Sequence, residues 1–98
     1  MLSIYTKHLR NLFTREEYMT ITRTHRDKIR YYLRTYYTVD EFRNLFSTFY
    51  AYDVVLDVLQ NLENVTQEEI DAVKTARQRM QDMIDRSQRM RQYRQISR

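Results

Sequence analysis

The 98-residue chain contains no glycine, no proline and no cysteine. Glycine supplies the positive-φ positions of phosphate-binding loops, so its absence excludes a Walker loop, a dinucleotide fingerprint and a G-x-S-x-G nucleophile elbow. Without glycine and proline, the sequence has few ways to build anything other than helices. The absence of cysteine excludes disulfides, thiolate zinc sites and cysteine nucleophiles. No apolar run approaches the roughly 20 residues of a membrane-spanning helix, so we expect no membrane insertion.

A short pattern occurs three times: a threonine followed, three residues later, by a glutamate. It reads TREE at 14–17, TVDE at 38–41 and TQEE at 66–69. In such a capping box the threonine side chain accepts the glutamate's backbone N–H, and the glutamate side chain accepts the threonine's, so each box starts a helix. Apolar residues recur every three or four positions between the boxes. The predicted fold is a small all-α antiparallel bundle of four helices, at about 2–13, 15–37, 39–64 and 67–96.

The predicted helix 39–64 is apolar over more than half of its circumference, which makes it the central helix of the bundle. The last predicted helix begins apolar and becomes basic and polar after residue 85. At 1.5 Å per residue it would extend about 45 Å and overhang the bundle. We therefore expect one helical domain at 1–85 and a basic helical extension or tail at 86–98. A homodimer through the long helix is one interpretation of the overhang.

The net charge is +4, and fourteen of the seventeen basic residues are arginines. Arginine suits bidentate and stacked contacts, whereas lysine usually suffices for solubility. Five arginines fall within about a third of the circumference of the predicted helix 15–37. They are Arg15, Arg23, Arg26, Arg30 and Arg34. This ridge is either a solvated face partly paired with acidic neighbours such as Glu16 and Asp27, or a surface for a phosphate-bearing or acidic partner.

Six of the nine tyrosines lie between residues 31 and 52. The three that follow apolar stripes are predicted to pack in the core: Tyr32, Tyr36 and Tyr52. Tyr31, Tyr37 and Tyr50 point elsewhere, and Arg43 is close to them in sequence. Tyrosine and arginine are enriched in binding hot spots, and both can stack on unpaired bases. These four residues are therefore candidate partner-binding residues, with ordinary surface positions as the alternative.

The segment 86–98 contains five arginines and no acidic residue. Four of them are candidate contacts to an anionic partner: Arg86, Arg89, Arg91 and Arg94. The alternative is that these cations meet the dipole at the C-terminal end of a helix. A basic tail that folds only on its partner would have the same composition.

The sequence gives little support for catalysis or for a bound metal. Zinc needs three or four convergent ligands, and the chain has only two histidines. His25 lies on an apolar stripe and is predicted to be a hydrogen-bonded core residue. Asp53 and Asp57 share their side of the helix with polar residues, which indicates a solvated stripe or an internal clasp to the arginines of helix 15–37. We expect no enzymatic activity, no cofactor and no metal.

The first fifteen residues are basic, amphipathic and free of acidic side chains, as in a mitochondrial transit peptide. An ordinary first helix is the favoured interpretation. The segments MLSIYTKHLRNLF and IRYYLRTYY resemble the small basic helical LYR-motif proteins of mitochondria. Ile4, Tyr5 and Thr6 stand in place of the signature tripeptide, so the resemblance assigns no residue a role. We expect an intracellular protein, in the cytoplasm, with mitochondrial import as the alternative.

Three functional hypotheses follow. The favoured one is a helical adaptor or inhibitor that docks its arginine- and tyrosine-rich surface on an acidic protein or nucleoprotein. The second is direct nucleic-acid binding through the arginine ridge and the C-terminal arginines. A net charge of only +4 and an acidic middle segment weigh against it. The third is a self-assembling subunit that packs its helices between chains.

Overall fold

The computed structural model describes the backbone of residues 3–96 and the side chains of residues 3–89. The predicted side-chain contacts of Arg91 and Arg94 therefore lie outside the described residues. Six helices make up this part of the chain, and the prediction of an all-α helical bundle is confirmed. They are α1 (Ile4–Asn11), α2 (Arg15–Thr20), α3 (Arg23–Tyr36), α4 (Val39–Phe46), α5 (Tyr50–Gln60) and α6 (Gln67–Ile96).

All three capping boxes form, and each begins a helix. In each box the threonine and glutamate exchange two hydrogen bonds, each 2.9–3.2 Å long. The pairs are Thr14 with Glu17 at α2, Thr38 with Glu41 at α4, and Thr66 with Glu69 at α6. These bonds satisfy N–H groups that lack a partner inside the helix.

The predicted helix 15–37 is interrupted, which corrects the expected boundaries. Ile21 ends α2 in an extended conformation, with φ −73° and ψ 122°. Its side chain is buried, and the Thr22 hydroxyl oxygen accepts the backbone N–H of His25 at 3.3 Å, which starts α3. The break therefore combines burial of Ile21 with a second threonine N-cap. It was missed because this cap lacks the glutamate that marks the other three.

The predicted helix 39–64 is also divided. The hydroxyls of Ser47 and Thr48 donate to the carbonyl oxygens of Asn44 and Leu45, each at 2.8 Å, which separates α4 from α5. Such local bonds compete with the helical hydrogen-bond pattern. α5 ends at Gln60, and the connection to α6 passes through residue 64 (asparagine) with φ 61°. Asparagine tolerates this left-handed conformation better than most other non-glycine residues.

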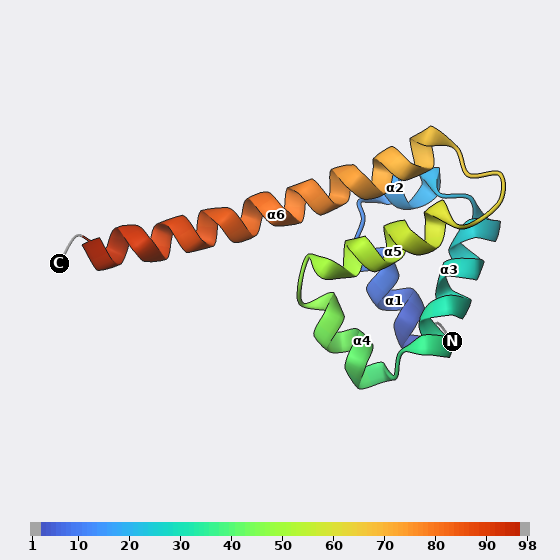
Figure 1. Cartoon of the computed structure of the whole chain (residues 1–98), viewed down its shortest axis with the longest axis horizontal. Coiled ribbons are helices and arrows are strands. Elements are labelled where there is room, and N and C mark those ends of the chain that lie inside the picture. Colours follow the sequence, from blue (N-terminus) through green and yellow to red (C-terminus); the bar gives the residue numbers. More distant parts are fainter. Residues whose placement is uncertain (1–2, 97–98) are drawn as a thin grey trace.

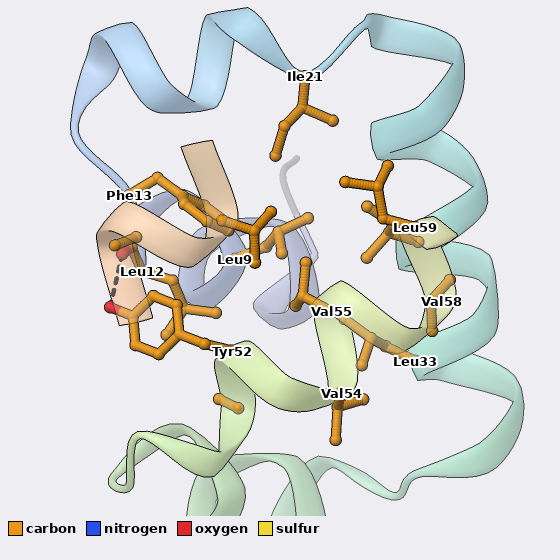
Figure 2. Packing of buried hydrophobic residues seen from close by; sticks show 14 of the residues in the cluster. Leu9, Leu12, Phe13, Ile21, Leu33, Tyr52, Val54, Val55, Val58 and Leu59 are labelled. Carbon is orange, nitrogen blue, oxygen red and sulfur yellow. Dashed lines mark hydrogen bonds between the residues drawn. The ribbon is translucent and has the colours of Figure 1, made fainter. Parts of the chain in front are cut away.

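The core lies where α5 meets α1, α3 and α6. Val55 and Leu59 of α5 are fully buried, together with Leu9 of α1 and Leu33 of α3 (Figure 2). Tyr52 is also buried, as predicted, and its hydroxyl donates to the carbonyl oxygen of residue 12 at 2.6 Å. Burial raises the pKa of the Tyr52 hydroxyl. The prediction that the middle of the chain supplies the core is confirmed for α5.

α6 runs antiparallel to α5 and packs on α5 and α2 through its N-terminal half (Figure 1). Its C-terminal half projects beyond the other helices, as the overhang prediction stated. The projection gives the molecule principal extents of 53 × 30 × 23 Å. No helix within the described part of the chain is both long enough and apolar enough to cross a membrane.

Candidate basic interaction groove

An open groove of about 930 Å³ lies between α1, α2 and α3. Six basic side chains line it: Lys7, Arg10, Arg15, Arg23, Arg26 and Arg30. No acidic residue is among its lining residues. The other lining residues include Phe13, Tyr18 and the 61% exposed Met19. We call this feature the basic groove. Its walls are cationic, and part of its lining is apolar.

The interruption at Ile21 divides the predicted arginine ridge between two helices. Arg15 lies on α2, whereas Arg23, Arg26 and Arg30 lie on α3, and all four line the basic groove. Four of the five ridge arginines therefore meet at one site. The fifth ridge residue, Arg34, is exposed and is not among the lining residues.

Tyr18 of α2 organises the arginines inside the groove. The Arg26 guanidinium lies over its ring at 4.4 Å from the centroid, and the Arg10 guanidinium lies at 5.7 Å. An Arg26 Nη1 donor also reaches the Met19 sulfur at 3.7 Å. The Arg26 Nε atom is buried and has no hydrogen-bond partner among the described residues. These cation–π contacts hold the guanidinium groups in place, and the aromatic ring does not neutralise their positive charge.

Most of the positive charge in the groove is not neutralised. Arg30 pairs with Asp27, one helical turn away. Among the described residues, the other five basic residues of the groove form no ion pair. Like charges held this close repel one another, and a bound anion would relieve that repulsion. Sequence reasoning missed Lys7 and Arg10, although the acid-free composition of the first fifteen residues was their signal.

The remaining predicted arginines lie elsewhere. Arg43 of α4 is exposed and pairs weakly with Asp40, at 3.8 Å. Arg86 and Arg89 are exposed on the projecting part of α6. The structure therefore separates the candidate arginines into the groove and the α6 projection, with Arg34 and Arg43 in neither.

The predicted tyrosines do not line the basic groove. Tyr31 is 67% exposed on α3, and Tyr50 is 58% exposed at the start of α5. The core prediction for Tyr36 is wrong, because Tyr36 is 65% exposed. Its ring instead packs against that of Tyr32, with centroids 4.5 Å apart. Tyr32 packs against the core and is half-buried.

Tyr37, the residue directly after α3, is half-buried. Burial raises the pKa of its hydroxyl, and the hydroxyls of Tyr32 and Tyr50 and the carboxylates of Glu41 and Asp57 raise the pKa further. Tyr31, Tyr37 and Tyr50 therefore lie outside the groove that contains four of the ridge arginines.

His25 is a buried, hydrogen-bonded residue, as predicted, but its partner was not foreseen. Its Nδ1 lies 2.6 Å from a carboxylate oxygen of Glu69, and its Nε2 lies 2.9 Å from the carbonyl oxygen of Glu63. Both neighbours of the ring offer oxygen atoms that can accept a hydrogen bond. The same Glu69 carboxylate accepts the backbone N–H of Thr22 at 3.2 Å. Glu69 therefore joins the starts of α3 and α6, in addition to closing its own capping box.

Asp53 forms an internal clasp, but with α6 and not with the arginines of the predicted helix 15–37. The Arg77 Nε donates to Asp53, and its guanidinium lies over the Phe49 ring at 4.9 Å. Asp57 is exposed, in line with the predicted solvated stripe. A second clasp joins α6 to α2, where Arg79 makes two hydrogen bonds of 2.8 and 2.9 Å to Glu17.

The comparisons with known proteins add no family to these observations. No protein-family model, no curated protein and no solved structure matches the chain. Among the described residues, no three or more histidine, aspartate or glutamate side chains are grouped so as to hold a metal ion. Any proposal about function therefore rests on the basic groove and on the other exposed surfaces.

Proposed function

We propose that the protein is a non-enzymatic interaction module that captures an acidic segment of a partner protein in the basic groove. The observation that carries this proposal is the charge of the groove: six basic side chains line it, and no acidic one does. Only Arg30 among them forms an ion pair within the described structure. A partner that supplies carboxylates would satisfy donors that the chain itself leaves open.

The apolar part of the lining favours a polypeptide ligand over a nucleic acid. Met19 is 61% exposed, and it lines a groove with cationic walls together with Phe13. An acidic segment that also carries an apolar side chain would match both features. Methionine adapts its shape to varied apolar partners and is common at such binding surfaces.

The contacts of Tyr18 also favour a polypeptide ligand over a nucleic acid. Arg26 and Arg10 both lie near its ring, at 4.4 and 5.7 Å from the centroid. Proteins that bind single-stranded nucleic acid usually offer free aromatic faces for stacking bases. The net charge of −6 on residues 38–85 would also repel phosphates that extend beyond the groove.

The test is fluorescence anisotropy with nucleic-acid-free protein at about 150 mM salt. The probes are a labelled peptide of alternating glutamate and leucine, a peptide with glutamine in place of glutamate, and labelled single- and double-stranded DNA and RNA. We expect the acidic peptide to bind and the glutamine peptide to bind at least tenfold more weakly. Tighter binding of any nucleic acid, with affinity falling steeply as salt rises, would favour the nucleic-acid function instead.

Variants locate the binding surface. Arg15→Glu with Arg23→Glu should weaken peptide binding at least tenfold, because both side chains line the groove. The matched control is Arg34→Glu with Arg43→Glu, which reverses two exposed arginines outside the groove and should leave affinity within twofold. Met19→Ala should weaken binding of the leucine-containing peptide about threefold to tenfold. Equal loss in the groove and control variants would show that only net charge matters.

A further inference from the structure

Two arginines of the basic groove converge on one aromatic ring. The guanidinium carbon of Arg26 lies 4.4 Å from the centroid of the Tyr18 ring, and that of Arg10 lies 5.7 Å from the same centroid. Arg10 belongs to α1, Tyr18 to α2 and Arg26 to α3, so each comes from a different helix of the groove. The tertiary fold therefore brings two guanidinium groups to one ring inside a single groove.

These two guanidinium groups keep most of their hydrogen-bonding capacity for a ligand. Among the described residues, neither Arg10 nor Arg26 forms an ion pair. The Nη1 of Arg26 reaches only the Met19 sulfur, at 3.7 Å, and a thioether is a weak acceptor. Each guanidinium carries five N–H donors, so the pair offers more donors than one carboxylate accepts.

A phosphorylated side chain matches this donor set better than a carboxylate does. Phosphoserine and phosphothreonine carry a charge of about −1.5 to −2 at pH 7 and three strong acceptor oxygens. Arginine binds phosphate through two parallel hydrogen bonds, whereas lysine binds it as a point charge. Lys7, Arg15 and Arg23 line the same groove and add positive charge around the pair. No acidic residue is among the lining residues, so nothing in the lining repels a dianion.

The groove suits one phosphate group on a polypeptide better than a nucleic-acid backbone. A phosphodiester carries a single negative charge, whereas a phosphate monoester carries nearly two at pH 7. The apolar side chains of Phe13 and Met19 line the groove beside the arginines and match an apolar side chain of a peptide. A phosphorylated side chain within an acidic, partly apolar segment therefore uses both parts of the lining.

We propose that Arg10 and Arg26 bind the phosphate group of a phosphoserine or phosphothreonine in the acidic partner segment. The inference rests on the proposed function, because it concerns the same ligand in the same groove. Tyr18 is a positioning residue, since its ring lies against both guanidinium groups. Phosphorylation of the partner therefore controls its capture.

Fluorescence anisotropy with three labelled peptides at about 150 mM salt and pH 7.5 tests this inference. The first is the peptide of alternating glutamate and leucine, the second has phosphoserine at its central glutamate position, and the third has serine there. We expect the phosphoserine peptide to bind at least tenfold more tightly than the glutamate peptide. The serine peptide should bind more weakly than either. An oligonucleotide with a 5′-phosphate that binds more tightly than the phosphoserine peptide would overturn the choice of a polypeptide ligand.

Charge-conserving variants separate the shape of the guanidinium from its charge. Arg10→Lys with Arg26→Lys should reduce the preference for phosphoserine over glutamate from at least tenfold to about twofold. Arg34→Lys with Arg43→Lys, the matched control outside the groove, should leave this preference unchanged. Tyr18→Ala should also reduce the preference, whereas Tyr18→Phe keeps the ring and should preserve it. A preference that survives in the Arg10 and Arg26 variant would overturn the assignment of these two residues.

Lowering the pH provides a readout that a purely structural role does not change. The second pKa of a phosphate monoester is about 6, so the phosphoserine peptide loses charge between pH 7.5 and pH 5.5. We expect its advantage over the glutamate peptide to fall at least threefold. The glutamate peptide remains ionised in this range and corrects for any titration of the protein's own histidines.

The two proposals about the groove fail in different ways. Equal binding of the phosphoserine and glutamate peptides would overturn this inference and leave the proposed function standing. If none of the acidic peptides binds, both proposals are wrong. Circular dichroism of each variant verifies that a change in affinity does not come from unfolding.

Discussion

At the scale of single residues, the glutamates of the capping boxes differ in what else they hold. Glu41 is exposed, and its hydrogen bonds are those of the box on α4. Glu69 is buried, with 1% of its surface exposed, and also binds Thr22 and His25. The same motif therefore acts as a local cap in one place and as a tertiary contact in another.

Replacing these glutamates by alanine should separate the two roles. Glu69→Ala removes its cap and also leaves Nδ1 of the buried His25 side chain without its hydrogen-bond partner, so we expect a loss of about 1–3 kcal/mol in the free energy of unfolding beyond the loss of the cap. Glu41→Ala removes only an exposed capping contact and should cost about 0.5–1 kcal/mol. Urea denaturation of both variants measures the difference. Equal losses would show that the buried pair contributes nothing beyond the cap.

The stability of the fold should fall in acid. Hydrogen bonds from Arg79 lower the pKa of Glu17. Burial acts to raise the pKa of Glu69, but hydrogen bonds from His25 and from the backbone of Thr66 and Thr22 outweigh it and leave the pKa lowered. Because the folded pKa values lie below the ordinary value of 4.5, this stability is fully present above pH 4.5. It is lost as the pH falls through the folded values.

Denaturation between pH 7 and pH 3 measures this loss. We expect the urea midpoint to decrease below pH 4.5, and we expect Glu17→Gln to reduce the size of that decrease. Glutamine is neutral throughout this range, so the variant removes one of the two titrating groups. A midpoint that is unchanged down to pH 3 would contradict the assignment of these two carboxylates.

At the scale of helices, a threonine N-cap sets where α3 begins. Thr22→Ala removes the side-chain oxygen that accepts the His25 N–H at the start of α3. We expect a loss of about 1 kcal/mol in unfolding free energy. Thr24→Ala, at an exposed position in the first turn of the same helix, should be neutral or slightly stabilising because alanine has the higher helix propensity. Thermal denaturation of both variants measures the difference in stability. Equal losses in the two variants would contradict the capping role of Thr22.

The sequence predicts where helices start better than where they are interrupted. Each capping box contains two signal residues, a threonine and a glutamate three positions later. The boxes at Thr14, Thr38 and Thr66 all begin a helix. The break at Ile21 has no such signal, because its apolar side chain continues the periodic stripe while the backbone turns. The same periodicity predicted a buried Tyr36. In the structure Tyr36 lies in the last turn of α3, where it is exposed.

The candidate site was predictable in part. Three arginines of the basic groove, Arg23, Arg26 and Arg30, follow from spacing along α3, because 100° per residue keeps them on one face. Arg15 precedes the break at Ile21 and lies on α2, so its place in the groove depends on the tertiary fold. Lys7 and Arg10 come from α1, and no pattern within one helix indicates that α1 packs beside α2 and α3. The contact between Glu69 and His25 also depends on the tertiary fold, because 44 residues separate them in the sequence.

At the scale of the whole molecule, α6 divides the structure into a packed part and a projecting part. Val73 and Ala76 are fully buried against the core, whereas Asp82, Met83 and residues 86–89 are exposed. The difference in packing predicts a gradient of local stability along one continuous helix. Amides that open only with the core exchange slowly, and those on an unsupported helix exchange quickly.

Hydrogen exchange measured by mass spectrometry should reveal this gradient. At about 1 μM, we expect amides of residues 81–89 to exchange at least a hundredfold faster than those of residues 72–79. The physical reason is the loss of packing partners beyond the first half of α6. Uniformly slow exchange along α6 in dilute protein would contradict the gradient and would show that the projecting part is as stable as the packed part.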